Sequence, residues 1–214
     1  MSIQGMTRTR TTDVIATARQ VQALVAAGCD IVRVALPTLA DVDAVAALRR
    51  EIGVIPLVAD VHFDHRIAIA AAPFVDKVRL NPGTLRSDAD VAEVVRALSD
   101  RGIPLRIGAN AGSLPPSLRK DPRPLAERLC LAAEDLVERF VRHGFEQLVI
   151  AVKASDAMDT ITACRLAAAR FDYPLHIGVT EAGTGREGTV QSAVALGILL
   201  DQGIGDTMRV SLAA

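Results

Sequence analysis

Polar and charged side chains recur in this sequence near the ends of short apolar runs. Arginine dominates the set, which also contains one of only three lysines. Guanidinium groups bind phosphate oxygens through paired hydrogen bonds, so several of them around one point indicate a phosphorylated or diphosphate ligand. Buried cations need anions nearby, and the acidic members of the set are too few to supply them. The set comprises Arg33, Asp60, His62, Arg79, Asn81, Arg106, Asn110, Lys153, Thr180, Glu181, Arg209 and Ser211.

Asp60, His62 and Glu181 are the candidate acids and bases of this set. Lys153 leaves two chemistries open. It can form a Schiff base with a carbonyl substrate, with Glu181 shuttling protons, as in a lyase acting on a phosphorylated compound. Alternatively, Lys153 is one more phosphate ligand and Glu181 is the acid of another reaction, and the number of surrounding cations favours this second interpretation.

A glycine-rich segment follows Glu181 and matches G-x-G-x-x-G through Gly183, Gly185 and Gly188. This motif alone is a weak signal of dinucleotide binding, which also requires an acidic residue at the end of the following strand. Residues 208–214 contain no acidic residue. We therefore expect the glycines to present backbone N–H groups and a helix N-terminus to a phosphate.

The elements that must position these residues alternate along the chain. Eight β-rich runs are separated by segments with helical periodicity, which predicts a (β/α)8 TIM barrel as one domain over residues 1–214. A doubly wound open sheet is the alternative. The last run is not followed by a helical segment, so the expected barrel lacks its last helix. The predicted strands are 2–6, 30–36, 56–61, 77–81, 104–110, 147–154, 174–180 and 207–212.

Composition excludes several classes of protein. The 214 residues are 50% hydrophobic and 23% charged with a net charge of −1, which argues against disorder and gives no electrostatic footprint for nucleic acid. No apolar run is long enough to cross a bilayer, and the N-terminus has no secretory pattern, so we expect a cytoplasmic location. Cys29, Cys130 and Cys164 are too far apart in sequence to indicate a disulfide framework or a metal site.

The polar positions also belong to recognisable sequence motifs over nearly the whole chain. Together they closely resemble the 4-hydroxy-3-methylbut-2-enyl-diphosphate synthase family, the iron–sulfur enzymes of the methylerythritol phosphate route to isoprenoids that take electrons from flavodoxin or ferredoxin. The motifs are QGMTRTRTTD at 4–13, DIVRV at 30–34, LVADVHFD at 57–64, RLNPG at 79–83, RIGANAGS at 106–113, VKAS at 152–155, GVTEAG at 178–183 and GDTMRVSL at 205–212.

The resemblance implies a barrel that binds 2-C-methyl-D-erythritol 2,4-cyclodiphosphate for reductive ring opening and dehydroxylation. It assigns the diphosphate to Arg33, Arg79, Arg106, Asn110, Lys153, Arg209 and Ser211. Asp60, His62, Thr180 and Glu181 would face the reacting polyol, with Glu181 as the proton donor when the hydroxyl group leaves.

The resemblance also sets an expectation about what this sequence lacks. Enzymes of the family carry a C-terminal domain whose three cysteines and one glutamate hold a [4Fe–4S] cluster, and no cysteine of this chain has suitable spacing. We therefore expect no cofactor on this chain and no reduction by it alone. It would be a truncated form of the synthase, or a stand-alone barrel that either only binds its ligand or is completed by a cluster domain in trans, as the family's homodimers suggest.

Overall fold

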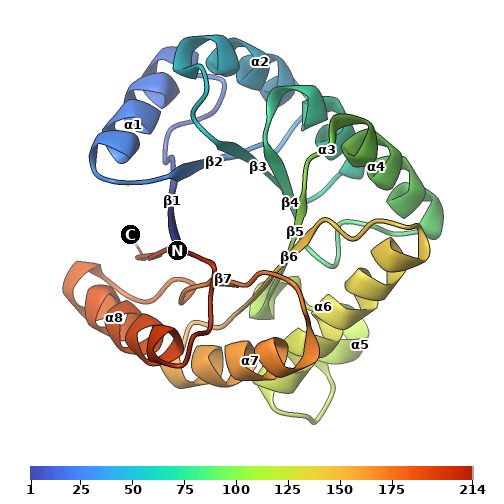
Figure 1. Cartoon of the computed structure of the whole chain (residues 1–214), viewed down its shortest axis with the longest axis vertical. Helices are drawn as coiled ribbons and strands as arrows, with labels where there is room; N and C mark the ends of the chain where they lie inside the picture. Colours follow the sequence, from blue (N-terminus) through green and yellow to red (C-terminus); the bar gives the residue numbers. More distant parts are fainter. Residues whose placement is uncertain (214) are drawn as a thin grey trace. The chain divides into compact units, whose positions relative to one another are not determined.

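The computed structural model describes residues 1–213 and divides them into two compact units. The N-terminal unit comprises residues 2–106 and 139–147, and the C-terminal unit comprises residue 1 with 107–138 and 148–213. In both units strands alternate with helices along the chain (Figure 1). No helix of the described residues is long and apolar enough to cross a membrane.

The N-terminal unit contains a parallel sheet in the order β4-β3-β2-β1. Register places Met6 opposite Arg33, and Asp60 opposite both Ala35 and Arg79. Helices α1 to α4 cover one face of this sheet (Figure 1). The elements are β1 (Ser2–Met6), α1 (Val14–Ala26), β2 (Ile31–Ala35), α2 (Ala40–Ile52), β3 (Leu57–Val61), α3 (His65–Ala71), η1 (Ala72–Phe74), β4 (Lys77–Leu80) and α4 (Asp88–Arg101).

The C-terminal unit pairs β7 with β8 in parallel, and a bridge from Ile150 to Leu175 joins β6 to the start of the β7 segment. Two elements contribute residues to both units, namely β5 (Leu105–Asn110) and α6 (Leu125–Arg142). The remaining elements are η2 (Ala111–Ser113), α5 (Pro116–Arg119), β6 (Leu148–Lys153), α7 (Ala157–Arg170), β7 (His176–Ile177), α8 (Gly185–Asp201) and β8 (Thr207–Met208).

Local sequence explains where the helices begin and end. Ser87 caps α4 with a capping box, in which its hydroxyl accepts from the Asp90 N–H and the Asp90 carboxylate accepts from the Ser87 N–H. Gly102 ends the same helix in the left-handed conformation. The core is aliphatic, and each central strand is buried along most of its length.

Two predicted strands are wrong in length. The predictions at 174–180 and 207–212 shrink to the two-residue strands β7 and β8. Gly178 has a φ of 144°, and a Cβ added there would lie 2.2 Å from the Arg209 carbonyl oxygen. The ladder therefore stops at Ile177 because the backbone turns at a glycine. In the described residues no helix follows β8.

Candidate functional site

Asp60 is the centre of a buried ionic cluster in the N-terminal unit. Arg79 Nη1 donates to Asp60 Oδ1 at 2.8 Å, and Arg33 Nε lies 3.5 Å from Asp60 Oδ2. Strand register produces the first contact directly, because Arg79 is the β4 residue opposite Asp60. Arg33 also donates from Nη2 to Met6 Sδ at 2.7 Å. Two guanidinium groups thus share one carboxylate, which leaves the cluster with an excess of positive charge.

The electrostatics of the cluster keep Asp60 ionised. Burial by itself raises the pKa of the Asp60 carboxyl group. The hydrogen bond with His62 and the positive charges of the two arginines outweigh burial, so the pKa lies well below its ordinary value. Asp60 is therefore a permanent anion that orients cations, and it is poorly suited to accept a proton from a substrate near neutral pH.

His62 follows β3 directly and contacts both members of the Asp60–Arg79 pair. Its Nε2 lies 2.8 Å from Arg79 Nη1 and 3.1 Å from Asp60 Oδ1. Because an arginine nitrogen can only donate, a neutral His62 accepts at Nε2 from Arg79. A protonated His62 can instead donate from Nε2 to Asp60. The ring is about 40% exposed, so it is the member of this cluster that can exchange protons with a ligand.

Arg106 forms a second buried polar group in the same unit. It is the second residue of β5, and its long side chain extends to Gln4 in the middle of β1. Arg106 Nη1 donates to Gln4 Oε1 at 2.9 Å, and both side chains are buried. Burial and the charge of Arg106 lower the pKa of the nearby Lys77. This unit therefore carries two further cations, Arg106 and Lys77, in addition to Arg33 and Arg79.

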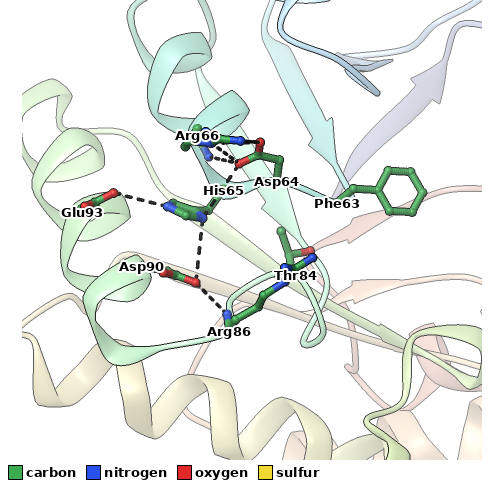
Figure 2. Close-up of a pocket in the computed structure, with 8 residues that line it drawn as sticks. All are labelled: Phe63, Asp64, His65, Arg66, Thr84, Arg86, Asp90 and Glu93. Atoms are coloured by element: carbon green, nitrogen blue, oxygen red, sulfur yellow. Dashed lines mark hydrogen bonds and ion pairs between the residues drawn. The ribbon is translucent and has the colours of Figure 1, made fainter.

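A polar hollow of about 510 Å³ lies over the loops that follow β3 and β4 (Figure 2). Several of its charged groups are paired. His65 Nε2 lies 3.3 Å from Glu93, and Arg66 binds Asp64 through two nitrogens. Thr84 donates from Oγ1 to the His62 carbonyl oxygen at 2.8 Å, while its own N–H donates to the Asn81 carbonyl oxygen at 3.0 Å. We assign this hollow a structural role, in which it fixes the segment carrying His62.

The C-terminal unit collects a second set of predicted residues around the ends of β6, β7 and β8. Lys153, the last residue of β6, is buried, and its Nζ donates to the Ile177 carbonyl oxygen at 3.3 Å. The Arg209 N–H donates to the same oxygen at 3.1 Å. A Cβ on Gly178 would lie 3.1 Å from Lys153 Nζ, so a glycine is needed where these segments meet.

Backbone hydrogen bonds continue this arrangement beyond the short strands. The Ala182 N–H donates to the Ser211 carbonyl oxygen at 2.9 Å, and the Thr180 N–H donates to the Ala154 carbonyl oxygen at 2.9 Å. These bonds hold the loop containing Thr180 and Glu181 against the segments that follow β6 and β8. Within this unit, the predicted residues Lys153, Thr180, Glu181, Arg209 and Ser211 therefore lie on adjoining segments.

Glu181 has an unusual backbone. Its φ of 50° is in the left-handed region, and it is the one non-glycine residue of positions 1–213 with a positive φ. This conformation is unfavourable for residues with a Cβ and persists where the surroundings impose it, often at functional sites. The side chain is exposed, which suits a group that transfers a proton to a ligand.

Asn110, the last residue of β5, has a local structural role. Its Oδ1 accepts from the Ser113 N–H at 3.0 Å, and the Ser113 hydroxyl donates to the Asn110 carbonyl oxygen. These bonds cap the short helix η2. A ligand of Asn110 would accordingly be held by its amide nitrogen, because the amide oxygen is engaged in the cap.

The glycine-rich segment has the predicted strand–loop–helix setting, since it joins β7 to α8. Thr184 precedes α8 without a side-chain cap. Glu187 lies in the first turn of α8, and a Cβ added to Gly183 would come within 3.3 Å of its carboxylate. This negative charge at the helix N-terminus opposes the binding of an anion there, which weakens the expectation that the glycine loop holds a phosphate.

Comparisons with known proteins give matches that extend over the whole length of this chain. Residues 1–214 match the family described as the GcpE TIM-barrel domain. The chain belongs to the GcpE TIM-barrel family. It is 48% identical over 216 aligned residues to "4-hydroxy-3-methylbut-2-en-1-yl diphosphate synthase (flavodoxin)" of Hamiltonella defensa, and 47% identical to the enzymes of Vibrio cholerae and Escherichia coli. Each alignment covers 100% of this chain and 58% of the relative, so the chain spans little more than half of their length.

Solved structures resemble this GcpE barrel in fold. Dihydropteroate synthase from Thermus thermophilus gives a TM-score of 0.69 at 14% sequence identity, covering 99% of this chain and 86% of that one. Type I 3-dehydroquinate dehydratase from Clostridium difficile gives 0.64 at 15% identity, covering 98% and 83%. The predicted TIM-barrel class and the predicted family are confirmed, and the doubly wound alternative is wrong.

The [4Fe–4S] cluster that the family implies does not fit the side chains of this barrel. Cys130 Sγ and Cys164 Sγ donate to backbone carbonyl oxygens, and burial raises the pKa of these thiols to about 11 and about 12. The cysteine ligands of such a cluster must be thiolates. Across residues 1–213 there is no group of three or more His, Cys, Asp or Glu side chains that could hold a metal ion.

Two residues of the GcpE barrel that contact the predicted site were not predicted. Gln4 contacts Arg106, and Thr84 holds the His62 carbonyl oxygen. Gln4 had a usable signal, because it is a polar residue within a short β-rich run. Thr84 had none, since a threonine in a loop after a strand is common.

Proposed function

We propose that this chain is the substrate-binding barrel of a 4-hydroxy-3-methylbut-2-en-1-yl diphosphate synthase and that it acts in the cytoplasm on 2-C-methyl-D-erythritol 2,4-cyclodiphosphate. The observation that carries the proposal is the buried cluster of Arg33, Asp60 and Arg79 in a chain that aligns from end to end with these synthases. A cyclic diphosphate supplies anionic oxygens of the kind that buried guanidinium groups bind.

The phosphate oxygens are assigned to cationic side chains and to two neutral donors. Guanidinium groups bind them through pairs of hydrogen bonds, whereas a lysine ammonium acts as a compact point charge. Lys153 Nζ donates to the Ile177 carbonyl oxygen, and the number of cations assigned to the same ligand favours a phosphate-ligand role over a Schiff-base nucleophile. The assigned phosphate ligands are Arg33, Arg79, Arg106, Asn110, Lys153, Arg209 and Ser211.

The proton-handling roles follow from the environments of the acidic and basic side chains. Asp60 remains ionised and orients Arg79 and His62, while His62 exchanges a proton on the polyol side of the substrate. Glu181 donates the proton that accompanies departure of the hydroxyl group, since its side chain is exposed and its backbone has the positive φ often found at functional sites. Thr180 helps to orient the polyol beside it.

None of these assigned steps moves an electron. Ring opening with loss of the hydroxyl group requires two electrons, so turnover depends on a [4Fe–4S] domain outside the described residues and on reduced flavodoxin or ferredoxin as the donor. That domain can be supplied in cis or by a second polypeptide, including a second subunit of a homodimer. The barrel alone would bind substrate without converting it.

Titration calorimetry tests this function. The folded chain is titrated with the cyclodiphosphate and, as a matched control, with 2-C-methyl-D-erythritol, which has the same carbon skeleton and no phosphate. We expect saturable heat with the cyclodiphosphate only. Absence of heat with the cyclodiphosphate, or equal binding of both compounds, would refute the proposal.

A further inference from the structure

Gln4 is a buried polar residue on β1 that lies among the predicted phosphate ligands. It is 4% exposed, and it accepts a hydrogen bond from Arg106, a residue 102 positions away in sequence. Two residues further along β1, Met6 contacts Arg33. Because side chains two residues apart point to the same side of a strand, Gln4 shares the sheet face that carries Met6 and Arg33.

The contact with Arg106 determines which positions the oxygen and the nitrogen of the Gln4 amide occupy. An arginine nitrogen can only donate, so the oxygen Oε1 must face Arg106 Nη1, and the Nε2 group must take the other position. Gln4 is neutral, and its hydrogen bond therefore orients the Arg106 guanidinium without cancelling its charge. A glutamate at this position would orient Arg106 equally well but would neutralise it.

Gln4 Nε2 is the second relevant feature of this residue. It is enclosed and has no hydrogen-bond partner in the part of the chain that the structure describes. Nearly all buried polar groups in proteins are paired with protein atoms or with a bound molecule. Nε2 and Oε1 share one carbon atom, so an oxygen atom placed beside the Arg106 guanidinium can also accept from Gln4.

We propose that Gln4 binds the diphosphate directly through its Nε2–H group while it positions Arg106 through Oε1. This inference rests on the proposed function, because it assigns Gln4 to the phosphate site of the same substrate. The use of an amide, rather than a carboxylate or an apolar side chain, is the chemical reason for the assignment. An amide offers an acceptor to the cation and a donor to the anion without adding charge.

Two substitutions separate the two contacts. Gln4→Met keeps the length of the side chain and removes both contacts, whereas Gln4→Glu keeps the acceptor for Arg106 and replaces the donor with a negative charge. The matched control is Gln202→Met, because Gln202 Oε1 accepts from Arg165 Nε at 2.9 Å on the exposed surface. All three variants are titrated with the cyclodiphosphate and with inorganic diphosphate, after circular dichroism has verified folding.

We expect Gln4→Met to weaken binding of both probes about tenfold, Gln4→Glu to weaken it at least as much, and Gln202→Met to leave it within about twofold. A double-mutant cycle supplies a readout that a merely structural role would not move. In an Arg106→Met background, Gln4→Met should still weaken diphosphate binding by more than about twofold, because Nε2 contacts the ligand itself, and loss of the whole effect would show that Gln4 acts only through Arg106.

The outcomes distinguish this inference from the proposed function. Wild-type affinity in both Gln4 variants, with normal cyclodiphosphate binding by the parent chain, would overturn the inference and leave the proposed function intact. Binding of inorganic diphosphate that weakens in the Gln4 variants, without any cyclodiphosphate binding by the parent, would support the inference and overturn the proposed substrate. If Gln4→Met fails to fold, Gln4→Glu decides the matter, because it retains the bond to Arg106.

Discussion

Arg79 and Asp60 are neighbours in register on β4 and β3, and Arg79 Nη1 lies 2.8 Å from Asp60 Oδ1. The same arginine nitrogen contacts His62 Nε2 at 2.8 Å. A single buried carboxylate therefore sets the orientation of a predicted phosphate ligand and of a predicted proton carrier. This relationship makes the ionic cluster of the N-terminal unit a cooperative group, in which the loss of Asp60 removes a contact from Arg33, Arg79 and His62.

Replacing Asp60 should destabilise the fold strongly. Asp60→Asn removes the carboxylate shared by Arg33 and Arg79 and leaves buried cations, so we expect a loss of about 3–5 kcal/mol in the free energy of unfolding. The control Asp64→Asn breaks the exposed pair with Arg66 while retaining an N-cap for α3, and it should cost at most about 1 kcal/mol. Urea denaturation measures both, and equal effects would contradict the assignment.

The pH dependence of stability should reveal the same carboxylate. The pKa of Asp60 is lower in the folded chain than in the unfolded chain, so its contribution is fully present above the unfolded pKa and is lost as the pH falls. Between about pH 5 and pH 3, the wild type should lose more free energy of unfolding than Asp60→Asn does. Parallel stability curves for the two proteins over this range would be inconsistent with a buried ionised Asp60.

Glu181 should be a site where function opposes stability. Glu181→Gly relieves the left-handed backbone and should raise the free energy of unfolding by about 1 kcal/mol, whereas Glu181→Ala should not. Glu181→Gln should leave cyclodiphosphate binding nearly unchanged and abolish proton transfer when the barrel is supplied with a cluster domain. Full turnover of Glu181→Gln in such a system would remove Glu181 from the role of acid.

The three thiols should differ sharply in reactivity. The high pKa values of Cys130 and Cys164, about 11 and about 12, leave almost no thiolate at pH 8, and both side chains are buried. Cys29 is only half-buried, although burial and the charge of Asp30 also raise its pKa. With a disulfide reagent, one thiol per folded chain should react first and three after denaturation. Rapid reaction of all three in the folded protein would contradict this packing.

The alternation of elements was predictable because it depends on local pattern. The first strand matches its prediction at 2–6, and Ser87 caps α4 as its side-chain chemistry predicts. The strands at 174–180 and 207–212 were overextended because periodicity does not report a backbone turn. The turn at Gly178 depends on the approach of Arg209, which is distant in sequence.

The chemistry of the site was predictable by residue type, but its pairing was not. Sequence indicated that Asp60, His62 and Arg79 belong to one site, yet only register and distance reveal that one Arg79 nitrogen serves both partners. Asn110 was predicted to be a ligand, and its use as a cap depends on the conformation of the following turn. Gln4 was overlooked although it is a polar residue in a β-rich run, because its contact with Arg106, 102 residues away, is visible only in the structure.

The central claim is that buried cations of this barrel bind the phosphates of the cyclodiphosphate, and calorimetric titration of Arg106→Ala tests it most directly. Arg165→Ala is the control, since Arg165 contacts a glutamine on the surface. We predict that Arg106→Ala weakens binding by at least about 1.5 kcal/mol, or roughly tenfold, and that Arg106→Lys weakens it less. An unchanged dissociation constant in a folded Arg106→Ala variant would contradict the account.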